Sequence, residues 1–85
     1  MITVAPHIRS IVDHDGAVLL DIPRNAIATL DSTGAYIWGR LQRGLQVDAI
    51  VAELARDTGA DVLVVAKDVE EFLEQLKLRH LVSLS

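Results

Sequence analysis

The spacing of the hydrophobic residues changes once along this chain, at Asp31. Before that residue, short runs rich in β-branched side chains alternate with turn residues, which is typical of strands. After it, hydrophobic residues recur every three or four positions, which is the period of amphipathic helices. Strands followed by helices predict an α+β fold, in which a sheet packs on a layer of helices.

Before Asp31 the sequence predicts three short strands, at residues 8–12, 17–20 and 26–30. Asp15 and Gly16 give a two-residue hairpin signal between the first two strands. Pro23 and Asn25 suit a second turn, because proline favours the φ of a turn position and asparagine tolerates a left-handed conformation. We therefore expect a three-stranded antiparallel sheet.

Two short helices are expected next. The first begins at a capping residue, Asp31 or Ser32, and the second begins near Val47. Each ends at a glycine, the first at Gly44 and the second at Gly59.

The third predicted helix begins near Asp61 and is the longest. Its hydrophobic residues cover an arc of about 100 to 120 degrees; they are Val62, Val65, Val69, Phe72, Leu73 and Leu76. Two short helices followed by a longer one resemble a helix-turn-helix unit. The last five residues, 81–85, can add a short return strand.

The chain of 85 residues forms a single domain, residues 1–85, because half this length buries too little apolar surface to fold. There is no cysteine, which excludes disulfides, thiolate zinc sites and cysteine nucleophiles. The N-terminal residues lack a long apolar run, so we expect neither a signal peptide nor a membrane span, but a cytoplasmic protein.

No set of residues predicts catalysis, a metal or a cofactor. His7, His14 and His80 fall in three different elements, without the spacing of a metal site. Ser32 has a capping role and no glycine elbow beside it. The carboxylates around Asp68 point in different directions on a helix, so a solvated surface explains them better than a cation site. We therefore expect a protein without enzymatic activity.

The net charge of −4 and the scattered basic residues disfavour binding to nucleic acid. A winged-helix DNA-binding regulator is nevertheless one alternative. Its recognition helix would need basic residues, whereas the third predicted helix is rich in acid and the second offers only Arg56.

The strand at residues 26–30 is the last of the sheet and should have one open edge. Such edges are usually protected by charge, proline or a bulge, but this strand carries no charge. A helix or the C-terminal tail can cover the edge. Alternatively, an extended peptide can add to it, with Ala26 and Ala28 leaving room for the larger side chains of the guest.

Four segments in the same order resemble the PqqD-like proteins, also called RiPP recognition elements, across nearly the whole chain. They are "DGAVLLD", "LDSTGAYIW", "VDAIVAEL" after a glycine, and "DVEEFLEQL" followed by "LV". The chain is most similar to the stand-alone leader-binding proteins of lasso peptide biosynthesis. This resemblance implies a compact winged helix-turn-helix domain without catalysis of its own.

The resemblance also implies a function. Members of the family bind the leader segment of a ribosomally made precursor peptide, which joins the sheet beside the third strand and lies against the third helix. They present it to a modifying enzyme: a leader peptidase and a cyclase in lasso systems, or a radical SAM enzyme in the pyrroloquinoline quinone case, which is a second alternative. A monomer or a weak dimer is expected, since the open edge can also pair with itself.

By position, the resemblance assigns peptide binding to two groups of residues. The strand group is Ala26, Ile27, Ala28, Thr29 and Leu30. The helix group is Val65, Asp68, Val69, Phe72, Leu73 and Leu76. For each apolar helix residue, packing in the core is the favoured alternative. Val65 and Phe72 are the favoured groove residues, because they lie at one margin of the apolar arc.

The sequence departs from the family pattern at a few positions. Asn25 and His80 stand where glycines are common, and histidine tolerates positive φ less well. Gln46 replaces a serine or threonine, which predicts a weaker cap for the second helix. Ala28 often aligns with an aromatic residue, so its small side chain is expected to widen the groove.

Overall fold

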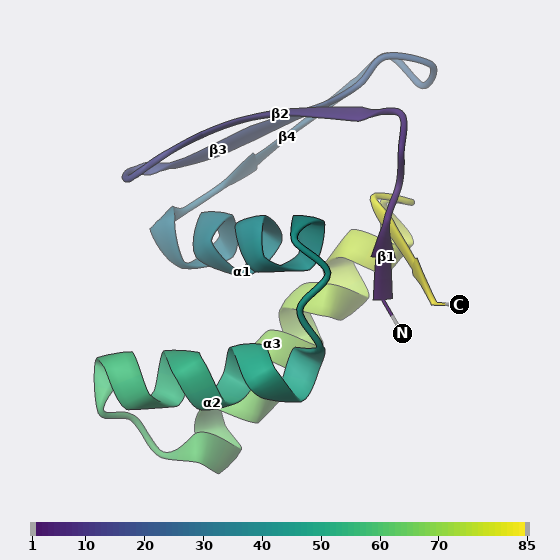
Figure 1. Cartoon of the computed structure of the whole chain (residues 1–85). Helices are drawn as coiled ribbons and strands as arrows, with labels where there is room; N and C mark the ends of the chain where they lie inside the picture. The colour runs from purple at the N-terminus through teal and green to yellow at the C-terminus, as the bar shows by residue number, and fades with distance from the viewer. Residues whose placement is uncertain (1, 85) are drawn as a thin grey trace.

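The computed structural model describes residues 2–84, apart from the side chain of Leu84. Three of its strands form an antiparallel sheet in the order β2-β3-β4 (Figure 1). They are β2 (Ile8–Asp13), β3 (Gly16–Asp21) and β4 (Ala26–Leu30). The α+β class and the three-stranded sheet expected from the sequence are confirmed.

The hairpin between β2 and β3 differs by one residue from its predicted position. Asp13 pairs with Gly16, so the two-residue turn is His14 and Asp15. The Asp13 carboxylate accepts hydrogen bonds from the backbone N–H groups of Asp15 (2.8 Å) and Gly16 (3.1 Å). Gly16 is required for another reason, because a Cβ there would lie 2.3 Å from the carbonyl oxygen of Leu30.

The three helices follow the sequence prediction closely. They are α1 (Ser32–Gln42), α2 (Val47–Thr58) and α3 (Val62–Leu78). Asp31 caps α1 by accepting a hydrogen bond from the Gly34 N–H, at 2.8 Å. Gln46 makes no side-chain capping bond to α2, which confirms the weaker cap expected there.

A second, two-stranded sheet joins the two ends of the described chain. It pairs β1 (Ile2–Val4) with β5 (Val82–Leu84) in antiparallel register, and both lie beside the C-terminal end of α3 (Figure 1). The sequence predicted the return strand but not β1. The N–H of Ala5 extends this link by donating to the Leu81 carbonyl at 3.0 Å.

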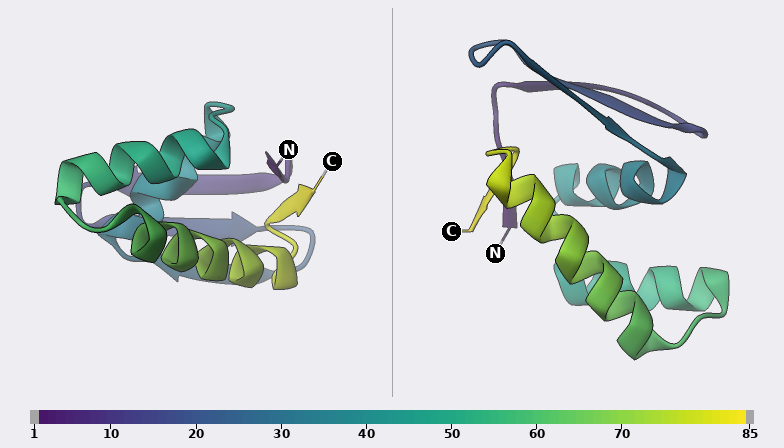
Figure 2. Two further views of the ribbon diagram at one scale, coloured as in Figure 1. Left: turned by 90° about the horizontal axis from the view of Figure 1, so that it is seen from below. Right: turned by 180° about the vertical axis from the view of Figure 1, so that it is seen from behind.

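All three helices lie on one side of the larger sheet, with α1 next to it and α2 farthest from it (Figures 1 and 2). The core between these layers is centred on Trp38, which is fully buried. The other largest fully buried side chains are Leu19, Ile50, Leu76 and Val69. Val62 was expected on the buried arc of α3 but is 51% exposed, because the first turn of α3 extends beyond the core.

Side chains alternate across the sheet as a pleated strand requires. On β4, Ala28 faces the helices and is 8% exposed, whereas Ile27 is 71% exposed. Ala28 pairs with the buried Leu19 of β3 and Ile27 pairs with Leu20. Neighbouring residues of β4 therefore lie on opposite faces of the sheet.

Candidate functional site

One edge of β4 is open. Within residues 2–84, β4 pairs only with β3, and the C-terminal strand that could have covered the edge pairs with β1. Neither the small side chains of Ala26 and Ala28 nor the other side chains of β4 carry a charge. The structure thus leaves an uncharged strand edge, which is the arrangement that accepts a further strand.

A cavity of about 180 Å³ lies between this edge and α3. The strand contributes Ala28, Thr29 and Leu30 to its walls. The other residues come from α3 and the turn after it: Phe72, Gln75, Leu76, Arg79 and Leu81. We call this space the middle cavity.

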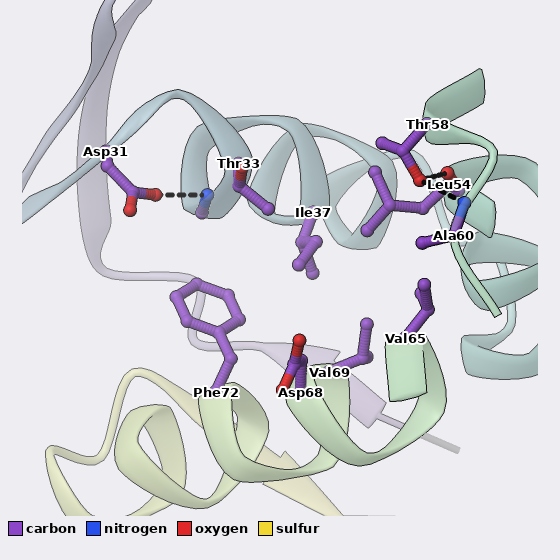
Figure 3. A pocket seen from close by; sticks show the side chains of 11 residues that line it. Asp31, Thr33, Ile37, Leu54, Thr58, Ala60, Val65, Asp68, Val69 and Phe72 are labelled. Carbon is purple, nitrogen blue, oxygen red and sulfur yellow. Dashed lines mark hydrogen bonds between the residues drawn. The ribbon is translucent and has the colours of Figure 1, made fainter. Parts of the chain in front are cut away.

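A second cavity, of about 410 Å³, continues toward the N-terminal half of α3 (Figure 3). It is walled by α1, the end of α2 and α3, and we call it the acidic cavity because its charged residues are Asp31 and Asp68. The remaining residues are Thr33, Gly34, Ile37, Leu54, Thr58, Ala60, Val65, Val69 and Phe72. Phe72 is shared with the middle cavity.

Gly34 lets Phe72 lie against the start of α1. A Cβ at Gly34 would be 3.1 Å from Cε1 of Phe72 and 3.2 Å from Cβ of Leu30. Such distances are shorter than an ordinary carbon contact, so a Cβ here would require the ring to shift by a few tenths of an ångström. The position of Phe72 between two cavities therefore depends on a glycine in a different helix.

A third cavity, of about 480 Å³, lies at the Ala26 end of β4, and we call it the basic cavity. Its lining residues are Leu19, Asp21, Arg24, Ala26, Ile27, Ala28, Arg79 and Leu81. It shares Ala28, Arg79 and Leu81 with the middle cavity. The three cavities thus adjoin one another along α3, two of them beside β4, and we call this row of cavities the groove.

Asp21 is a buried carboxylate at the base of the basic cavity, 3% exposed. One oxygen accepts a hydrogen bond from the backbone N–H of Arg24 at 3.2 Å and lies 3.5 Å from Nε2 of His7. The other oxygen lies 3.5 Å from Nε of Arg24 but accepts no hydrogen bond from the described residues. This charge holds Arg24 and the β3–β4 turn at the mouth of the cavity.

Most of the site residues expected from the sequence lie along this groove. All five residues of the strand group form β4. Of the helix group, Val65, Asp68, Val69 and Phe72 line the acidic cavity and Leu76 lines the middle cavity. Leu73 is 5% exposed and lines none of these three cavities.

The groove also contains residues that sequence reasoning missed. Gln75 on α3 and Arg79 at its C-terminal cap follow Phe72 by three and seven positions, so their helical spacing could have revealed them. Gly34 and Arg24 could not be found this way, since neither shares an element with the residues it approaches.

A hydrogen-bonded cluster holds α1 and α2 together next to the acidic cavity. The Tyr36 hydroxyl donates to the Glu53 carboxylate, which also accepts from Nη2 (2.8 Å) and Nε (3.1 Å) of Arg40. The Arg40 guanidinium lies 4.3 Å from the centre of the Tyr36 ring. The bonds from Tyr36 and Arg40 lower the pKa of Glu53, while burial and the bond to Glu53 raise the pKa of Tyr36.

Residues 2–84 contain no group of three metal-binding side chains, and none of their helices is long and apolar enough to cross a membrane. The side of α3 away from the groove carries Glu70, Glu71 and Glu74 beside Lys67 and Lys77. A helix with this charge pattern is poorly suited to phosphate contacts.

Comparison with known proteins agrees with this geometry. A family model described as coenzyme PQQ synthesis protein D (PqqD) matches residues 16–82. The solved structure of TbiB1 in complex with the TbiA(beta) leader peptide is similar, with a TM-score of 0.92 and 25% identity over 98% of this chain and 96% of that chain. A lasso peptide synthetase B1 complexed with the leader peptide has a TM-score of 0.88 and 22% identity, covering 98% of both chains. No curated protein matches the sequence.

Proposed function

The chain belongs to the PqqD family, and we propose that it binds the leader segment of a ribosomally made precursor peptide. The observation that carries this proposal is the open edge of β4 beside a groove walled by α3. A leader strand adding to β4 would gain main-chain hydrogen bonds from the edge and side-chain contacts from the groove. The similar TbiB1 structure contains a leader peptide, which supports the same use here.

The residues proposed to hold the leader are those of the strand and helix groups, except Leu73. Ala26, Ala28 and Leu30 face the groove, and the shallow side chain of Ala28 leaves space for a large guest side chain. Phe72 provides an aromatic wall at the junction of two cavities. We place Leu73 in the core that supports this wall, because it is buried away from the groove.

We further propose that the protein has no catalytic activity and delivers the leader to modifying enzymes in the cytoplasm. The similarity to a lasso peptide synthetase B1 favours a leader peptidase, and a cyclase, as the next partners. The description of the family favours, as the second candidate, an enzyme of cofactor biosynthesis such as a radical SAM protein. A pull-down distinguishes these two candidates. The immobilised protein, in the presence of leader, should retain either a leader peptidase and cyclase or a radical SAM enzyme, but not both.

Leader binding is tested with the fluorescently labelled leader of a small precursor peptide, identified by reading the genes adjacent to this one. Fluorescence polarisation should show saturable binding to the wild-type protein. Ala28→Arg should weaken it at least tenfold, because it puts bulk and charge into the groove. Ile11→Arg is the matched control, since it places the same side chain on β2 of the same sheet, at a residue that is 66% exposed and lines none of the three cavities.

Circular dichroism must show that both variants are folded. Because Ala28 is 8% exposed, Ala28→Leu provides a second, uncharged variant that fills the same space. No saturable binding by the wild-type protein, or equal binding by the Ala28 and Ile11 variants, would contradict the proposed site.

A further inference from the structure

Charged residues are segregated along the groove. The acidic cavity is lined by Asp31 and Asp68 and by no cation. At the other end, the basic cavity is lined by Arg24 and Arg79, and its one acid, Asp21, is buried. The groove therefore has a negative end near Leu30 and a positive end near Ala26.

Two of these charges are available to a ligand. Asp31 already caps α1, and Arg24 is held near Asp21. In contrast, neither Asp68 nor Arg79 forms an ion pair or a side-chain hydrogen bond with another residue in the described part of the chain, and both are exposed. Asp68 projects from α3 toward α1 beside Phe72 (Figure 3). A bound peptide can therefore pair with each of them.

The sheet indicates which way the peptide would run. Each pair of neighbouring strands in it is antiparallel, and purely antiparallel sheets are favoured over mixed ones. A guest strand antiparallel to β4 has its N-terminal part near Leu30 and its C-terminal part near Ala26. It would then meet Asp68 first and Arg79 later.

The spacing of the two charges sets a matching spacing in the peptide. Asp68 and Arg79 are separated by about 16 Å along the axis of α3. An extended strand covers that length in about five residues. Since alternate side chains face the helix, the two matching positions are four or six residues apart.

We propose that the groove selects leaders with a basic residue four or six positions before an acidic one, read from N to C terminus. The basic side chain pairs with Asp68 and the acidic one with Arg79. This inference rests on the proposed leader-binding function and adds a charge rule to it. Complementary charges of this kind contribute more to specificity and orientation than to affinity.

The rule is tested by selecting peptides of twelve randomised residues, displayed on phage, against the immobilised protein. Peptides enriched on the wild type but not on Ala28→Arg are counted as groove binders. We expect these to carry a basic residue before an acidic one at the stated spacing. Selection on Asp68→Lys should remove the basic preference, and selection on Arg79→Glu should remove the acidic one.

Matched controls lie on the other side of the same helix. Lys77→Glu and Glu71→Lys make equivalent charge changes at residues that line a cavity away from the groove. They should leave the selected sequences unchanged. For a peptide selected on the wild type, each groove variant should weaken binding about 5- to 20-fold at low salt, and less at high salt.

The outcomes distinguish the charge rule from the leader-binding function on which it rests. If no peptide is enriched over bare support, leader binding itself is contradicted. If groove binders are enriched without a charge preference, or with the acidic residue first, only the charge rule is overturned. If the control variants change the selected sequences as much as the groove variants do, the pairing with Asp68 and Arg79 is overturned.

Discussion

At the scale of single residues, two turns each contain a residue other than glycine in the left-handed backbone conformation. Asn25 has φ of 53° in the turn before β4, and His80 has φ of 59° in the turn after α3. Both conformations were expected from the sequence, because these residues stand where glycines are common in the family. Asparagine adopts this region readily, whereas histidine is less suited to it. The turn after α3 is therefore the more strained of the two.

Replacing these residues with glycine should have unequal effects. His80→Gly relieves a left-handed side chain, and we expect it to raise the free energy of unfolding by about 0.5–1 kcal/mol. Asn25→Gly should change it by less than about 0.5 kcal/mol, because asparagine is tolerated there. Urea unfolding followed by the fluorescence of the single tryptophan, Trp38, measures both. Equal changes in the two variants would show that histidine carries no special strain.

The roles of some residues could be predicted from the sequence, and those of others could not. The small Ala28 and the uncharged edge strand predicted a place for a guest, because alternation along a strand is a local property. Gly34 gave no such signal, since the Phe72 ring that requires it lies in a different helix. Arg24 and Asp21 likewise acquire their role from a turn that brings them to the end of the groove.

At the scale of elements, the contact between α1 and α2 depends on one carboxylate. Glu53 of α2 accepts hydrogen bonds from both Tyr36 and Arg40 of α1. These two helices also line the acidic cavity through Ile37 and Leu54. The residues of this cluster line none of the three cavities, but by joining α1 to α2 the cluster helps to set the shape of the groove.

The stability of the protein should depend on this cluster in acid. The pKa of Glu53 is lowered in the folded state, mainly by the bond from Tyr36 and then by Arg40. Its contribution is therefore complete above the unfolded pKa of about 4.5 and is lost as the pH falls through the folded pKa. Glu53→Gln should therefore lower the melting temperature at pH 7. The difference in melting temperature between this variant and the wild type should become smaller in acid.

A matched control for this titration is Glu71→Gln. Glu71 lies on the exposed side of α3 and makes no ion pair or side-chain hydrogen bond within the described residues. In thermal unfolding at pH 3 to 7, the melting temperature of this variant and that of the wild type should change in parallel with pH. If the melting temperature of the Glu53 variant changes with pH in the same way as that of the wild type, ionisation of the Glu53 carboxylate does not stabilise the fold.

The sequence predicted elements well where the signals are local. The helix starts follow from capping residues such as Asp31 and Asp61, and the end of α2 from the left-handed Gly59. The short strand β1 could not be predicted, because three residues carry no period and its partner lies at the other end of the chain. The predicted position of the hairpin turn was wrong by one residue. Gly16 is needed because its Cα lies close to the Leu30 carbonyl, and not because it is part of the turn.

At the scale of the whole molecule, the small sheet links the start of the chain to the end of α3. Val82 of β5 is 4% exposed and pairs with Val4 of β1. Leu81, which precedes it, lines both the middle and the basic cavities. Because α3 forms one wall of the groove and β4 the other, this link helps to fix the distance between them.

Loosening the link should therefore weaken leader binding from outside the groove. Val82→Ala removes two buried methyl groups and should lower the free energy of unfolding by about 2 kcal/mol. Val51→Ala removes the same groups from α2, at 8% exposure, and serves as the control. We expect similar losses of stability by urea unfolding but a several-fold weaker leader affinity, by fluorescence polarisation, only for Val82→Ala. Equal affinities would mean that the position of α3 against β4 is set by the helical core alone.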